Sequence, residues 1–155
     1  MVANAQRKKS VFLLVLLTGF LFIFSIARLH AEPEPEPDPD AEPEIRYVIE
    51  TQLEAFARGD AATAYAQAAP SIQAIFPSEQ IFMIMVYSGY YALIGPKRVD
   101  FLELYWDNEG AVYRVGIEST NGKRWVALYR MSKQQEDATW KISGCQLFPA
   151  IGESV

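Results

Sequence analysis

Residues 101–144 read FLELYWDNEGAVYRVGIESTNGKRWVALYRMSKQQEDATWKISG, and apolar side chains recur there at every second position. This period of two is typical of strands with one buried face. The alternating residues form four groups: Leu102, Leu104 and Trp106; Tyr113, Val115 and Ile117; Trp125, Ala127, Tyr129 and Met131; and Trp140, Ile142 and Gly144. Turn-forming residues separate the groups, and Asn121-Gly122 is a strong hairpin signal. The stretch therefore predicts a four-stranded antiparallel meander with one apolar face.

Apolar residues at helical spacing precede the strands. The first predicted helix has one apolar face, made of Ile45, Val48, Ile49, Leu53 and Phe56. Gly59 is suited to end this helix, and Asp60 is suited to cap a second helix over Ala61–Ala68, which Pro70 stops. A short helical turn is compatible with Ser71–Phe76.

A third helix is predicted to begin at the N-cap Ser78 and to carry the apolar run Ile81–Tyr87. Because this run is apolar all round, we interpret it as the central core helix, buried on every side unless it faces a partner. Gly95-Pro96 ends the helical half. The expectation is an α+β fold in which three N-terminal helices pack on a four-stranded curved antiparallel sheet.

This order of elements resembles the cone-shaped nuclear-transport-factor-2-like (cystatin-like) fold. Three motifs are more specific: Phe82-x-x-Met85-Val86-x-x-Gly89-Tyr90, Trp125-x-Ala127-x-Tyr129 and Trp140-Lys-Ile-Ser-Gly-Cys145. They resemble a family of small exported bacterial proteins described as domain of unknown function 4864, over most of Ile45–Leu147. The resemblance implies a fold and a compartment, and it brings no functional residues with it.

Residues 1–31 have the pattern of an export segment, with a basic cluster at residues 7–9 and an apolar run from Val11 to Phe24. Small residues place signal cleavage after Ala27 or Ala31. The apolar run reaches the lower limit for spanning a bilayer, so an uncleaved single transmembrane anchor is the alternative. Either reading predicts an exported domain, periplasmic or anchored to the inner membrane and facing the periplasm.

Residues 32–44 alternate proline with carboxylates, which predicts a disordered, extended acidic linker. The folded domain is therefore expected at residues 45–150. It carries ten basic and twelve acidic side chains over residues 45–155, and this near-neutral balance lacks the basic stripe of a nucleic-acid-binding protein. Contact with a membrane is expected only through the N-terminal segment.

The only histidine, His30, lies in the export segment. Serine–histidine and cysteine–histidine catalysis and histidine-ligated metals are therefore excluded from the domain, and no cofactor, metal or catalytic residue is predicted. Cys145 is the only cysteine, so no intrachain disulfide forms. We interpret it as a small buried residue of a strand.

Aromatic residues suggest where a ligand would bind. Rings with an apolar body and a polar tip suit apolar ligands with one polar end, and the candidate pocket lining is Tyr90, Tyr113, Trp125, Tyr129 and Trp140. An ordinary core is the competing interpretation of the same rings. Four charged strand residues, Glu103, Arg114, Glu118 and Arg130, are interpreted as a solvated ladder of cross-strand ion pairs.

Three functions follow from these features. The first is an uncharacterised extracytoplasmic binding module for a small ligand or a protein, with a pocket in which few charged groups converge. The second is an acid–base enzyme of the dehydratase, isomerase or hydrolase type, which requires Asp100 or Glu118 to point into a cavity beside a tyrosine hydroxyl. The third is a structural homodimer that pairs through its sheet.

Overall fold

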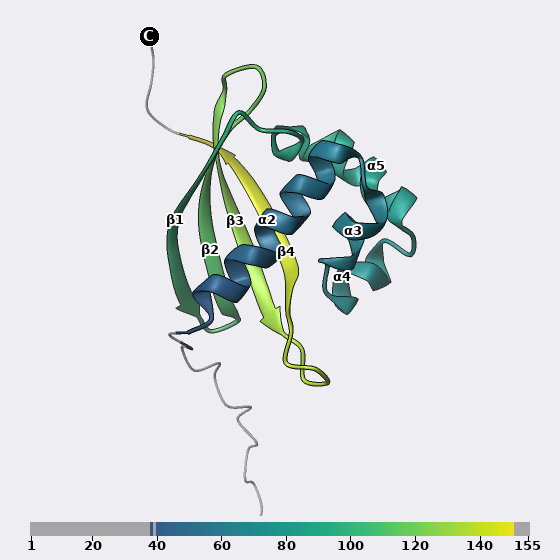
Figure 1. Ribbon diagram of the computed structural model, residues 1–155, viewed down its shortest axis with the longest axis vertical. Helices are drawn as coiled ribbons and strands as arrows, with labels where there is room; N and C mark the ends of the chain where they lie inside the picture. The colour runs from purple at the N-terminus through teal and green to yellow at the C-terminus, as the bar shows by residue number, and fades with distance from the viewer. Residues whose placement is uncertain (1–37, 39, 151–155) are drawn as a thin grey trace, which may run out of the picture. The chain divides into compact units, whose positions relative to one another are not determined.

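The computed structural model describes Asp38 and residues 40–150, and Figure 1 shows their arrangement. The helical elements come first: α2 (Glu42–Arg58), α3 (Ala61–Ala66), α4 (Pro70–Ile75), α5 (Glu79–Gly89) and the 3₁₀ turn η1 (Tyr91–Leu93). The strands follow: β1 (Arg98–Asp107), β2 (Gly110–Glu118), β3 (Arg124–Lys133) and β4 (Trp140–Pro149). The protein is therefore an α+β protein with its helices N-terminal to its strands.

The four strands form one curved antiparallel sheet in the order β1-β2-β3-β4, which confirms the predicted meander. In the turn between β2 and β3, Gly122 has a φ of 81°, a conformation that glycine adopts without steric cost. The Gly122 amide donates to the Ser119 carbonyl at 2.9 Å. The Asn121-Gly122 signal therefore marked a true hairpin.

Helix α2 crosses one face of the sheet (Figure 1) and buries its apolar stripe there. It begins at Glu42, three residues before the predicted start of the domain, so residues 42–44, which were expected in the extended linker, are helical. Pro43 lies in the first turn of α2, where backbone N–H groups have no intrahelical acceptor. The missing N–H of proline therefore costs no hydrogen bond there. The Glu42 carboxylate accepts a 2.6 Å hydrogen bond from the Tyr113 hydroxyl, which fixes this first turn to β2.

The described residues contain four α-helices where three were predicted, because Pro70–Ile75 forms the separate helix α4. The segment between α3 and α4 binds the edge of β4. The Ala69 backbone N–H donates to the Ile142 carbonyl at 2.8 Å, and the Ile142 backbone N–H donates to the Gln67 backbone carbonyl at 2.9 Å. These bonds cover part of an edge strand that would otherwise expose unpaired backbone groups.

Helix α5 is not the central core helix that its sequence suggested. It buries only Phe82, Met83 and Val86, whereas Ile84 on the opposite side is 65% exposed. The helix contacts α3 and η1 beyond the edge of β4, so one face packs and the other is open (Figure 1). The long core element is α2.

Two register shifts break the period-two pattern of the strands. One lies between Phe101 and Glu103, and Leu102, predicted to face the core, is 50% exposed there. The other lies in β4, opposite Arg130 and Met131 of β3. Cys145 and Leu147, which follow this shift in β4, pack against the core. A bulge adds one residue to a strand and so changes the face on which the following side chains lie.

Among the described residues, no helix is both long enough and apolar enough to cross a membrane. The export segment at residues 1–31, its cleavage positions Ala27 and Ala31, and the linker up to residue 37 lie outside the described residues. Their assignments stay predictions.

Candidate functional site

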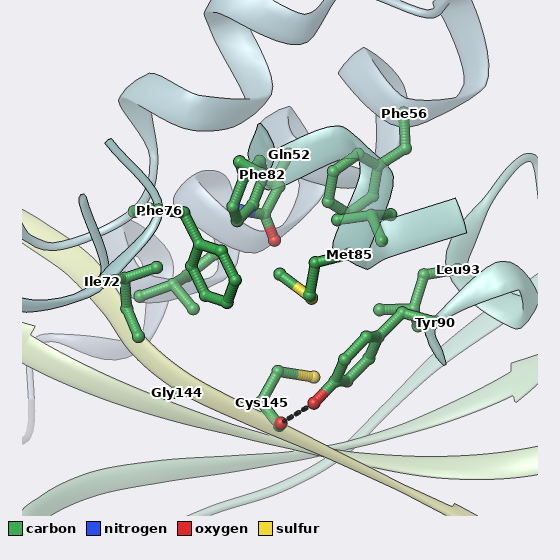
Figure 2. Close-up of a pocket in the computed structure, with 13 residues that line it drawn as sticks. Gln52, Phe56, Ile72, Phe76, Phe82, Met85, Tyr90, Leu93, Gly144 and Cys145 are labelled. Atoms are coloured by element: carbon green, nitrogen blue, oxygen red, sulfur yellow. Dashed lines mark hydrogen bonds between the residues drawn. The ribbon is translucent and has the colours of Figure 1, made fainter. Parts of the chain in front are cut away.

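A cavity of about 270 Å³ lies between the helices and strand β4. Figure 2 shows its walls: α2 contributes Gln52 and Phe56, while α5 and the following residues contribute Phe82, Met85 and Tyr90. Val86 of α5 adds to this wall, and the remaining walls come from the α3–α4 region, η1 and β4, with Ala68, Ile72, Phe76, Leu93, Ile142, Gly144 and Cys145. The volume is close to the lower end of the range of ligand pockets, about 300–1,000 Å³.

A hydrogen bond at one side of the cavity connects the end of α5 to β4. The Tyr90 hydroxyl, at the C-terminal end of α5, donates a 2.9 Å hydrogen bond to the Cys145 carbonyl (Figure 2). The aromatic ring therefore spans the space between the helix end and the strand. On the other side, the Tyr65 hydroxyl donates to the Phe76 carbonyl at 2.6 Å, which fixes the end of α4.

The walls carry no charged side chain. Burial raises the pKa of the Tyr90 hydroxyl above its ordinary value of 10, and it raises the pKa of the Cys145 thiol to about 12. Both groups are therefore protonated and neutral at physiological pH. A protonated thiol is a poor nucleophile, so the site offers no activated group for covalent catalysis.

Of the five aromatic residues predicted to line a pocket, only Tyr90 lines this one. Tyr113 is 2% exposed, with its hydroxyl turned to Glu42, and burial and that carboxylate raise its pKa to about 12. Tyr129 is fully buried opposite Cys145 in the strand register, and its hydroxyl has no hydrogen-bond partner among the described residues. Burial holds its pKa well above 10.

The two tryptophans are packing residues. Trp125 contacts Tyr91 edge to face, with ring centres 5.8 Å apart, and Trp140 contacts Trp106 in the same way at 5.8 Å. Both lie away from the cavity walls. The competing interpretation of these rings, an ordinary core, therefore fits the buried Tyr113, Tyr129 and Trp140, while Trp125 is half-buried against the core and lines a groove of the sheet.

The strand carboxylates do not meet a tyrosine in a cavity. Asp100 accepts a 2.9 Å hydrogen bond from exposed Arg98, and Glu118 lies 3.9 Å from the same guanidinium. Both line a shallow groove of the sheet to which no tyrosine contributes. Glu103 and Arg114 form the predicted cross-strand ion pair at 3.3 Å. In the part of the chain that the structure describes, no three carboxylate or thiol side chains gather to hold a metal ion.

Sequence reasoning missed most of the cavity walls, including Gln52, Phe56, Phe76 and Met85. A usable signal was present, because two of the three motifs quoted for the family resemblance supply walls of the cavity. Phe82, Met85, Val86 and Tyr90 come from the first of them, and Ile142, Gly144 and Cys145 come from the last.

Comparison with curated proteins finds no match. A comparison with family models does, and the matched segment, residues 38–155, contains every element described above. The match covers most of the chain and agrees with the three motifs. The protein therefore belongs to the family described as Domain of unknown function (DUF4864).

Proposed function

We propose that the domain is a non-catalytic binding module that holds a small apolar ligand in the cavity between α5 and β4. The observation that carries this proposal is an apolar wall without a single charged side chain. Burial of apolar ligand surface is favourable by roughly 25 cal/mol per Å², and such a wall has no charged acid–base group to offer. The acid–base alternative finds no support at Asp100 or Glu118, because both lie beside Arg98 and away from any tyrosine of the cavity.

The setting of this module is proposed from fold and sequence together. A curved antiparallel sheet with helices packed on one face, and a cavity beside them, supports the nuclear-transport-factor-2-like cone. The basic and apolar pattern of residues 1–31 supports export to the periplasm, with the domain either free or anchored to the inner membrane. Homodimerisation through the sheet stays a prediction that light scattering tests.

The test is a thermal-shift titration with indole, an uncharged bicyclic probe. A cavity of about 150 Å³ holds benzene, so about 270 Å³ accommodates a larger ring system. Nine heavy atoms at about −0.5 kcal/mol each give about −4.5 kcal/mol and a Kd of about 0.5 mM. At 2 mM indole the expected stabilisation is about 1 kcal/mol, which raises Tm by about 4 °C.

Helix α4 offers a matched pair of variants for this titration. Ile72 lines the cavity, whereas Ile75, one turn later, is 66% exposed and outside it. Ile72→Trp fills the cavity and should remove the indole shift, while Ile75→Trp should keep it. The proposal is wrong if indole gives no shift in the natural protein, or if both variants keep the shift.

A further inference from the structure

Gln52 is the one side-chain amide in the cavity wall, and we propose that it selects the polar end of the ligand. The ligand class is an uncharged, mainly apolar molecule whose buried end donates a hydrogen bond through a hydroxyl or an N–H group. Carboxylates are excluded. This inference rests on the proposed function and specifies which ligand the cavity takes.

The orientation of the Gln52 carboxamide is fixed by the protein. The residue lies on α2 and is 4% exposed, and its Nε2 donates a 3.2 Å hydrogen bond to the Ala64 carbonyl. Rotating the amide by half a turn would place Oε1 against that carbonyl, so two acceptors would face each other. Nε2 therefore points to α3, and Oε1 is the atom left for the cavity.

The carboxamide oxygen has no donor of its own. Figure 2 shows Oε1 pointing into the space above Met85, and no group in residues 40–150 donates a hydrogen bond to it. A ligand that fills the cavity would separate this oxygen from water, and an acceptor then left unpaired loses its hydration without compensation. A ligand donor placed here satisfies that need, whereas a purely apolar ligand leaves it unmet.

The other polar groups of the cavity reinforce this preference. The proton of the Tyr90 hydroxyl is already used in the bond to the Cys145 carbonyl, so its remaining capacity is as an acceptor. The Cys145 thiol donates a hydrogen bond only weakly. With Gln52 Oε1 also an acceptor and no cation in the walls, a carboxylate would be buried without compensation.

The test compares indole with indene, a ring system of the same shape in which a CH₂ group replaces the N–H. Titrations of the natural protein should give about 3- to 10-fold tighter binding of indole, as expected for one ordinary buried hydrogen bond. Gln52→Met keeps the length of the side chain and removes the acceptor, and it should abolish this preference. The Ala64 carbonyl keeps a hydrogen-bond donor in this variant, because the backbone N–H of Gln67 also donates to it.

Gln80→Met is the matched control, since Gln80 is exposed on α5 and does not line the cavity. It should retain the preference for indole. Equal binding of indole and indene to the natural protein would overturn the inference and leave the proposed function standing, whereas binding of neither would overturn the proposed function itself. The comparison in the natural protein decides the matter even if Gln52→Met fails to fold. Hexanoate binding as tightly as hexan-1-ol would also overturn the inference.

Discussion

Tyr113 and Tyr129 allow one substitution to be tested in two opposite settings. They are directly paired on β2 and β3, and their exposed fractions are 2% and 0%. The Tyr113 hydroxyl donates to Glu42 at 2.6 Å, whereas the Tyr129 hydroxyl has no partner among the described residues. Replacing each by phenylalanine removes the same oxygen, and the structure predicts opposite signs.

Tyr113→Phe should lower the free energy of unfolding by about 1–2 kcal/mol. A hydrogen bond to a charged group contributes about 1.5–3 kcal/mol, and the lower part applies because Glu42 is exposed and can be hydrated. Tyr129→Phe should instead raise the free energy of unfolding by about 1 kcal/mol. It removes a hydroxyl that loses its hydration on folding and gains no hydrogen bond in return. The two variants should therefore differ by roughly 2–3 kcal/mol.

Urea unfolding followed by tryptophan fluorescence measures both values, and an unchanged m-value shows that the unfolding transition itself is comparable. The expected separation in Tm is about 10 °C for a domain of this size. A Tyr129→Phe variant destabilised by more than about 1 kcal/mol would refute the reasoning, because the hydroxyl would then have a partner that stabilises the fold.

Three further predictions concern other parts of the domain. Arg130 donates to both carboxylate oxygens of Asp107 at 2.7 Å and lowers the Asp107 pKa to about 2, below its ordinary 3.8. The stabilisation from this ion pair is complete above about pH 4 and is lost as pH falls towards 2. The urea midpoint of Asp107→Asn should therefore fall less than that of the natural protein between pH 4 and pH 2. An equal fall in both proteins would contradict the lowered Asp107 pKa. Iodoacetamide should alkylate half-buried Cys145 far more slowly, by up to about a thousandfold, in the folded than in the unfolded protein at pH 8, because its pKa is raised from 9 to about 12; rates within tenfold would contradict the raised pKa. Gly59→Ala, at a φ of 69°, should lower the free energy of unfolding by about 1 kcal/mol, whereas Gly89→Ala inside α5 should not lower it; equal effects would argue against the left-handed cap.

Much of the fold could be predicted because its signals are local. Asp60 caps α3 through a 3.0 Å bond from the Thr63 amide, and Ser78 caps α5 through the Ile81 amide, both at the predicted positions. Gly59 ends α2 as expected. Each of these signals lies within four residues of the backbone group that it satisfies, so the sequence alone contains both partners.

The errors arose where tertiary structure decides. Leu102 lies outside the core because a bulge interrupts β1, and periodicity cannot reveal where a bulge falls. The apolar run of α5 could not show that only one face would be covered. The cavity depends on Gln52, Ile72 and Tyr90 from separate elements, and their meeting follows from the packing of α2, α4 and α5 around β4. Aromatic content suggested Tyr90, which lines the cavity, and equally suggested residues that pack in the core.

The most direct test of the cavity as a ligand site is ¹³C-methyl NMR of the methionines, of which the chain has four. Met85 lines the cavity, while Met131, 1% exposed, lies in the core outside its walls. On titration with indole we predict a saturable shift of the Met85 methyl resonance with the Met131 methyl resonance unmoved. A Met85 resonance that stays fixed at millimolar indole, or one that moves only as much as Met131, would contradict the account.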